Sequence, residues 1–237
     1  MARPLKPQEI LKTFERWGVP HDQVPGWKTR SNTNGWSPTG VSGCMHHHTG
    51  DDASDGADRA VLVKGRPGLR GPLANFGVTD RGRVEIISAG AANHAGMGDP
   101  RVLKAVRHES YDRFPPATHM HQGSPGAVGG NGKFYGWEAY YGAGDDPTIN
   151  ALQYRALILS TAAVISALDA IDGPAVRWTG RSCIGHKEWT DHKIDPRKID
   201  MSVDRADIQW CLDHGPAAAR HWYETGERKA AAVALHA

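Results

Sequence analysis

The chain has 237 residues, of which 39% are hydrophobic and 23% charged, so it can bury a core and is not disordered as a whole. Lysine and arginine number 28 and aspartate and glutamate 26; the net charge of +2 lacks the basic excess typical of a nucleic-acid binder. Thirteen histidines stand against three cysteines. Three cysteines cannot form a disulfide framework, whereas histidine is a frequent metal ligand and proton shuttle. The composition therefore indicates metal or acid–base chemistry.

The N-terminal segment has no apolar region or small-residue cleavage site of the kind that a secretory signal peptide requires. The most apolar stretch, residues 156–168, is 13 residues long and contains Ser160, Thr161 and Ser166. It is too short to span a bilayer and fits a buried helix. We therefore expect a chain made in the cytoplasm, without membrane insertion.

The N-terminal half predicts one helix and several strands. Ile10, Leu11 and Phe14 recur at helical spacing within residues 8–17, and Gly18 is suited to end that helix. Residues 41–49 could form a strand, although their apolar content is low, and strands are predicted at residues 73–78 and 84–88 on either side of a turn. Stretches rich in Gly, Pro, Ser, Asn or Asp predict loops at residues 23–40 and 50–72.

The C-terminal half predicts one aromatic strand and two helices. Residues 89–132 hold many glycines and predict a long, weakly structured and functional region. A strand is expected at residues 134–141, and helices at residues 148–171 and 204–213, the second ending before Gly215 and Pro216. Because strands and helices are interspersed, the expected fold class is α/β, with a central mixed β-sheet flanked by helices.

Two histidine clusters carry the possible chemistry. His46, His47 and His48 are consecutive, and on a strand His47 points to the face opposite the other two. Residues 185–196 gather His, Asp, Glu and Lys within a short segment, which is either a metal-binding segment or a solvated charged loop.

A closed zinc site is an alternative reading of the same segments. Cys44 and His47, and likewise Cys183 and His186, are each spaced as C-x-x-H, which could supply a Cys2His2 site. Cys44 and His47 would face opposite ways on a strand, so we expect the two cysteines to be small buried packing residues instead.

Five short motifs occur in an order that resembles a known family. They are H-H-T-G at 47–50, N-H-A-G at 93–96, G-W-E-A at 136–139, G-H-K-E-W at 185–189 and K-I-D-P at 193–196. This set resembles the zinc-dependent N-acetylmuramoyl-L-alanine amidases of type 2, which share their fold with peptidoglycan-recognition proteins and include many phage endolysins. The resemblance spans about residues 38–202. It implies that fold, with residues 1–37 as an N-terminal extension and 203–237 as a C-terminal helical extension.

The resemblance implies a zinc ion, Zn²⁺, held by three side chains. Its first ligand is His47, although His46 or His48 could replace it because the family has more aliphatic residues before this position. The second ligand is His186, and the third is Asp195 in the K-x-D-P pattern. Two imidazoles and a carboxylate leave the fourth position of a tetrahedral zinc for water or substrate.

Further roles follow from the same resemblance. Glu138 matches a catalytic glutamate that accepts the proton of the attacking water, and Lys193 matches a catalytic lysine that stabilises the developing oxyanion. His94 matches a histidine that lines the substrate groove. Its expected role is to contact the substrate, together with Asn93 and Trp137, or to support a metal ligand without binding the metal itself.

The implied function is cleavage of the amide bond between N-acetylmuramic acid and the first L-Ala of the peptidoglycan stem peptide, as in a phage endolysin. Such a protein is made in the host cytoplasm and acts on the cell wall after release. We expect a monomer whose partner is bacterial peptidoglycan. The alternatives are a non-catalytic peptidoglycan-binding module on the same fold and, with less support, a small histidine-metal nuclease.

Overall fold

The core of the molecule is a six-stranded sheet in a computed structural model that describes residues 1–118, 126–142, 148–173 and 178–228. In spatial order the strands are β1 (His21–Gln23), β6 (Val84–Ile86), β5 (Phe76–Val78), β9 (Phe134–Ala139), β2 (Gly43–His48) and β10 (Cys183–Gly185). All neighbouring pairs run parallel except β5 and β6, which run antiparallel. This confirms the predicted α/β class with a central mixed sheet.

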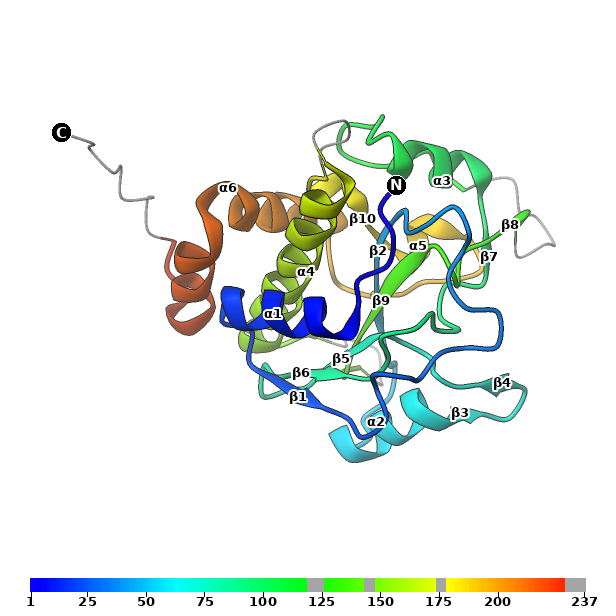
Figure 1. Cartoon of the computed structure of the whole chain (residues 1–237), viewed down its shortest axis with the longest axis horizontal. Helices are drawn as coiled ribbons and strands as arrows, with labels where there is room; N and C mark the ends of the chain where they lie inside the picture. The colour runs from blue at the N-terminus through cyan, green and yellow to red at the C-terminus, as the bar shows by residue number, and fades with distance from the viewer. Residues whose placement is uncertain (119–125, 143–147, 174–177, 229–237) are drawn as a thin grey trace.

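Helices cover both faces of the sheet (Figure 1). One side holds α1 (Pro7–Trp17), α4 (Ala151–Asp172) and α6 (Met201–Thr225), and the other holds α3 (Pro100–Arg107) and α5 (His186–Trp189). The remaining elements are α2 (Asp55–Lys64), the hairpin of β3 (Gly65–Arg66) and β4 (Leu69–Arg70), the pair of β7 (Met97–Gly98) and β8 (Val128–Gly129), and the short helix η1 (Gly180–Ser182).

Side chains of β2 and β9 alternate between two hydrophobic cores, as the period of a strand requires. Cys44 and Trp137 belong to the larger core, beneath α1, α4 and α6. Met45 and Phe134 belong to the smaller core, with side chains of α3 and α5. The central strands are therefore buried on both faces, and polar side chains that they carry must find partners inside the protein.

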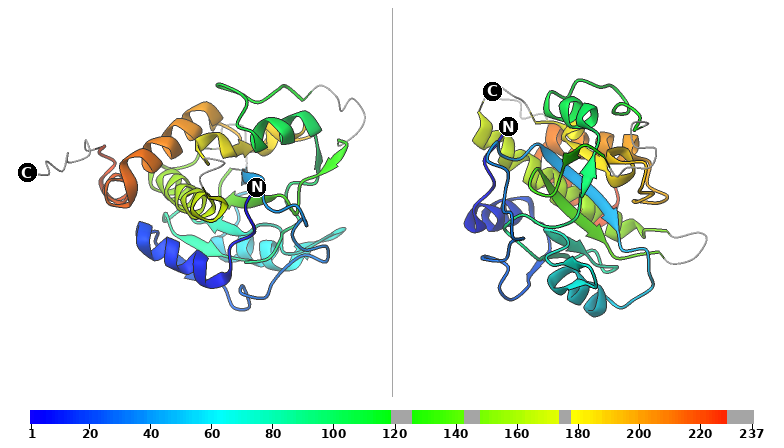
Figure 2. Two further views of the ribbon diagram at one scale, coloured as in Figure 1. Left: turned by 45° about the horizontal axis from the view of Figure 1, so that its top comes forward. Right: turned by 90° about the vertical axis from the view of Figure 1, so that its right-hand side faces the viewer.

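Helix α4 is the longest apolar element, and it lies between α1 and α6 (Figure 2). The Asn150 side chain caps its first turn by accepting from the Gln153 backbone N–H, and Gly173, with φ 76°, follows its last residue. By length and composition α4 could cross a membrane, but 61% of its most apolar window is buried inside this fold. The core accounts for its hydrophobicity, as expected for residues 156–168.

Several elements differ from the sequence expectations. Helices α2 and α3 lie in segments expected to be loop or weakly structured, and β10 lies in a segment with no expected strand. The first part of α6 ends at Gly215, where the backbone is not helical, as expected, and a second helical part then continues to Thr225. The expected N-terminal extension supplies α1 and the edge strand β1, so it is continuous with the core of the sheet.

Candidate metal centre

Three parallel strands, β9, β2 and β10, end at the same edge of the sheet. His47 lies opposite Glu138 in the register of β2 and β9, so both side chains project from the same face. His186 follows directly after β10, whose last residue, Gly185, pairs with His46. The carboxyl ends of parallel strands are where open α/β sheets bind their ligands. The topology therefore places His47, His186 and Glu138 at such an edge.

Three lone-pair atoms meet at this edge in a nearly equilateral triangle. His47 Nδ1 lies 3.0 Å from His186 Nδ1 and 3.0 Å from Asp195 Oδ2, and His186 Nδ1 lies 3.1 Å from Asp195 Oδ2. Asp195 comes from the loop after α5, where its backbone carbonyl accepts from the Lys187 N–H at 2.7 Å. The Lys187 ammonium also donates to the Pro196 and Ile199 carbonyls, which holds this loop against α5.

The triangle fits a tetrahedral zinc ion. With bonds of about 2.0–2.1 Å, two ligand atoms of a tetrahedron lie about 3.3 Å apart, close to the three separations found here. His186 Nε2 lies 3.2 Å from the Ala95 carbonyl, which can only accept, so in a neutral ring the proton is on Nε2 and Nδ1 carries a lone pair. Three such groups repel one another unless a proton or a cation lies between them, so the donor set suits a metal ion.

Protonation also favours metal binding. Burial, followed by the neighbouring His186, lowers the pKa of His47 to about 4, so its imidazole is neutral at pH 7. Burial alone would raise the pKa of Asp195, but its close contacts with the His186 and His47 imidazoles outweigh burial and bring that pKa below its usual value. Neutral imidazoles and an ionised carboxylate are the forms that bind zinc.

The other two histidines of the run do not reach this triangle. His46 points to the opposite face, where its ring nitrogens lie 2.7 Å from Asp204 Oδ2 and 2.8 Å from Thr161 Oγ1. His48 packs against Tyr141, with ring centroids 4.9 Å apart and the ring planes tilted by 42°. His47 is therefore the member of the run that the structure places with His186 and Asp195, as expected.

The alternative Cys2His2 site is wrong. Cys44 and Cys183 pair across β2 and β10 and are buried in the larger core, on the face opposite His47. Burial raises the pKa of both thiols, which disfavours the thiolate that binds zinc. Both cysteines are packing residues.

A cleft of about 500 Å³ opens beside the triangle, and Glu138 and Lys193 line it. Within the described residues, Glu138 Oε2 is buried and has no hydrogen-bond partner. Burial, followed by the charge of Asp195, raises the pKa of Glu138 well above its usual value, and the positive charge of Lys193 opposes that rise. A carboxylate that is desolvated, without a partner and adjacent to a candidate metal is typical of a general base.

Two of the three residues expected to contact the substrate are placed otherwise. Trp137 is fully buried in the larger core, where its Nε1 donates to Ser160, so that prediction is wrong. His94 lies beneath His47 with both ring nitrogens bonded inside the protein, so it offers no polar atom to a substrate. Asn93 lines the cleft, half-buried, and its substrate role stays a prediction.

Sequence reasoning missed the far wall of the cleft, which α2 and the β3–β4 hairpin build. This wall presents exposed apolar side chains of Val61 and Leu69, and Ile194 lies exposed on the rim. It also carries Asp58, whose side chain is buried near that of Asp51. The local signal for α2 was present, because Ser54 caps the helix by accepting from the Ala57 N–H.

Asp58 is expected to make stability depend on pH. Burial, followed by the charge of Asp51, raises its pKa from 3.8 to about 7, so between these values the folded chain keeps a proton that the unfolded chain loses. Stability from this group is complete below pH 3.8 and falls as pH rises toward 7. Asp58→Asn should therefore raise the free energy of unfolding by up to about 4 kcal/mol at pH 8 and hardly at all at pH 4. Urea unfolding at both values measures it; equal effects would contradict this assignment.

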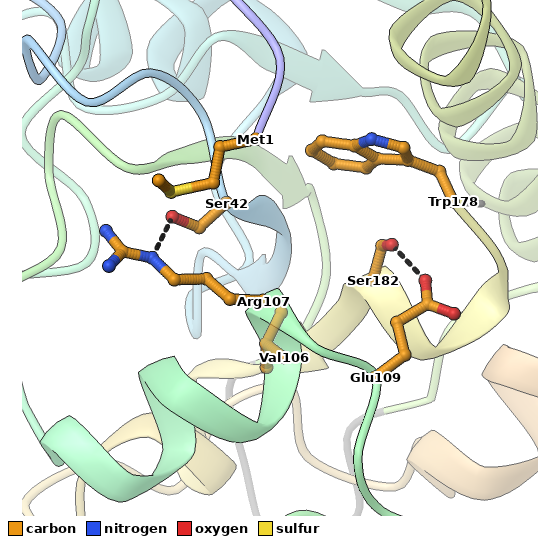
Figure 3. A pocket seen from close by; sticks show the side chains of 7 residues that line it. All are labelled: Met1, Ser42, Val106, Arg107, Glu109, Trp178 and Ser182. Atoms are coloured by element: carbon orange, nitrogen blue, oxygen red, sulfur yellow. Dashed lines mark hydrogen bonds between the residues drawn. The ribbon is translucent and has the colours of Figure 1, made fainter. Parts of the chain in front are cut away.

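Other cavities suit a ligand less well. The cavity in Figure 3, between Met1, Arg107 and Trp178, measures about 10 Å³, which is room for about one water. The polar groups drawn there are bonded to each other, Arg107 to Ser42 and Glu109 to Ser182.

A cleft of about 520 Å³ lies between η1 and α6, lined by Arg113, Arg181 and Arg205. Each of these guanidinium groups is paired with a carboxylate, so the arginines of this cleft do not present unpaired positive charge to a ligand.

Comparison with known proteins gives distant structural likenesses, among them two amidases. No protein-family model matches the sequence, and no curated protein matches it. An endolysin N-acetylmuramoyl-L-alanine amidase of Clostridium intestinale superposes with a TM-score of 0.46 at 13% identity, over 79% of this chain and 94% of that one. A second N-acetylmuramoyl-L-alanine amidase of that organism gives 0.44 at 13%, over 79% and 96%. Likeness this distant carries no functional conclusion, so the function is argued from the site.

Proposed function

We propose that the chain is a zinc-dependent N-acetylmuramoyl-L-alanine amidase of the type 2 family that hydrolyses bacterial peptidoglycan. The observation that carries the proposal is the convergence of His47, His186 and Asp195 on one point, beside the unpartnered carboxylate of Glu138. The order of the five sequence motifs supports the same assignment. An endolysin role, with synthesis in a host cytoplasm and action on the wall as a monomer after release, is part of the proposal.

Zinc would be held by His47 Nδ1, His186 Nδ1 and Asp195 Oδ2, and when bound it supplies a Lewis acid that polarises a carbonyl and acidifies water. Glu138 accepts a proton from the attacking water and delivers it to the leaving nitrogen. Lys193 lines the cleft, and its ammonium would stabilise negative charge that develops on the carbonyl oxygen. The amide C–N bond breaks; hydroxyl adds to the carbonyl carbon, and a proton adds to the amine.

The shape of the cleft agrees with this substrate. The scissile amide joins a lactyl group and an alanine, each of which carries a methyl group. Val61, Leu69 and Ile194 provide an exposed apolar rim beside the candidate catalytic groups. Residues 38–202 contain all the proposed catalytic residues, and the flanking segments support them through α1, β1 and α6.

The proposal is tested by identifying which bond of peptidoglycan the protein cuts. Purified protein with one equivalent of zinc is incubated with peptidoglycan, and the soluble products are analysed by mass spectrometry. We expect free stem peptides with an L-Ala amino terminus, together with glycan strands that end in unsubstituted lactyl carboxylates. Products cut within the glycan or within the peptide would overturn the assignment. Zinc-loaded protein that sediments with peptidoglycan and releases nothing would favour the non-catalytic binding module.

A further inference from the structure

His94 lies between strand β9 and the candidate ligand His47. Its Nδ1 is 2.9 Å from His47 Nε2, and its Nε2 is 2.9 Å from the backbone carbonyl of Phe134. The two imidazole rings meet edge to face, with centroids 5.1 Å apart. Both residues are buried, so water does not compete for these bonds. A chain of two hydrogen bonds thus joins a backbone carbonyl of β9 to His47.

The direction of this chain is set by its fixed end. The Phe134 carbonyl can only accept, so His94 Nε2 carries the proton, and His94 Nδ1 in a neutral ring is an acceptor. His47 Nε2 must then donate to it, which leaves the lone pair of His47 on Nδ1, the atom that faces His186 and Asp195. The carbonyl of a residue remote from the triangle thereby determines which nitrogen of His47 is free to bind a metal.

Without His94, the opposite tautomer would be favoured in the metal-free protein. Asp195 Oδ2 lies 3.0 Å from His47 Nδ1 and is an ionised acceptor, so it draws the proton to Nδ1. Such a ring has its lone pair on Nε2, away from the triangle. Zinc would then have to displace that proton before it could bind.

The His94 ring fits against β9 because residue 136 is a glycine. A β-carbon added to Gly136, on β9, would lie 2.6 Å from His94 Nδ1. Gly136 has an ordinary negative φ, so its missing side chain is needed for room, not for backbone conformation. The ring of His94 therefore occupies the space next to Gly136, the one position of β9 that has no side chain.

We propose that His94 is a positioning residue, which holds His47 in the Nε2–H tautomer and so keeps its Nδ1 lone pair directed at the metal site. It touches neither substrate nor metal. The consequence for zinc rests on the proposed function, whereas the tautomer of His47 is a property of the metal-free chain and is tested separately.

Three substitutions separate the two hydrogen bonds of His94. Asn places an oxygen where His94 Nδ1 lies and keeps the acceptor for His47. Gln places its amide nitrogen near the position of Nε2 and keeps the donor to Phe134. Leu has a similar volume and keeps neither. The tautomer of His47 is read from two-bond ¹H–¹⁵N correlations of the imidazole rings in metal-free protein at pH 7.5, and zinc affinity from competition with a chromophoric chelator.

We expect the Nε2–H tautomer of His47 in the wild type and in His94→Asn, and a shift toward Nδ1–H in His94→Gln and His94→Leu. Zinc affinity should stay within about 3-fold of wild type in His94→Asn and fall about 10- to 100-fold in the other two. Gly136→Ala should reproduce that loss, because it displaces His94 without changing any imidazole. Folding is checked by the dispersion of the amide spectrum.

The outcomes separate the two proposals. Nδ1–H in metal-free wild type, or unchanged tautomer and affinity in His94→Leu, overturns the role of His94 even if the protein is an active zinc enzyme. A wild type that shows Nε2–H but binds no zinc overturns the proposed metal site and leaves the tautomer assignment supported by the spectrum.

Discussion

Asp195→Asn should weaken zinc binding by at least about 100-fold and abolish amide hydrolysis, since loss of a partner of a ligand already costs about 10- to 100-fold. The substitution keeps the shape of the side chain and removes the only negative charge among the three candidate ligands. It leaves two neutral imidazoles, which hold zinc more weakly than the three-ligand set of a catalytic site.

Two measurements check this expectation. Zinc at 1,000 times its wild-type dissociation constant should stabilise the wild type by about 4 kcal/mol and Asp195→Asn by about 1.4 kcal/mol or less. Asp191→Asn is the matched control, because it makes the same change on the same loop at an exposed residue outside the triangle. Equal zinc stabilisation of Asp195→Asn and wild type would remove the triangle as the metal site.

The alternation of side chains along a strand predicts which residues of β2 and β9 share a face. The period of a strand predicts that His47 points away from His46, and the structure agrees. The same period also excludes Trp137 from a site that contains Glu138, because adjacent residues of β9 face opposite ways. The error over Trp137 was therefore avoidable from the sequence.

Other features depend on contacts between distant segments. His94 is directed inward by the Phe134 carbonyl and by the space above Gly136, and both partners lie about forty residues further along the chain. Strand β10 is three residues long and is defined by its pairing with β2, so it has too few residues to show a period of its own. Such placements follow from tertiary packing and not from local preference.

The missed helices have a local explanation. Asp99 accepts from the Arg101 N–H at the start of α3, and Pro100 occupies the first helical position, so both standard start signals were present. Many glycines surround these signals, so the composition of residues 89–132 predicts a weakly structured region in place of the helix. Helix α2, which forms part of the cleft wall, is not predicted for the same reason. Its start signal, Ser54, lies within a segment rich in Gly and Asp.

Glu138→Gln is expected to reduce kcat by about 10²- to 10⁴-fold, the usual contribution of a general base, while zinc affinity changes by less than about 3-fold. The amide cannot take a proton from water, but Glu138 is not among the three candidate ligands. Burial and Asp195 raise the pKa of Glu138, whereas a bound dication favours the charged form. Because a base works deprotonated, wild-type activity should rise with pH through this pKa.

The control for Glu138→Gln is Glu85→Gln, which changes a second buried glutamate in the same cross-strand row of the sheet. Glu85 pairs with Gly77, which in turn pairs with Glu138, but Glu85 is bonded to Arg59 and Tyr140 and does not line the cleft. A folded Glu85→Gln variant should keep its zinc affinity and its pH profile. Stopped assays on zinc-loaded protein between pH 5 and 9 should show the rise in wild type and in Glu85→Gln, with Glu138→Gln low and flat throughout. Wild-type turnover by Glu138→Gln would assign proton transfer to another group and leave the unpartnered carboxylate without a catalytic role.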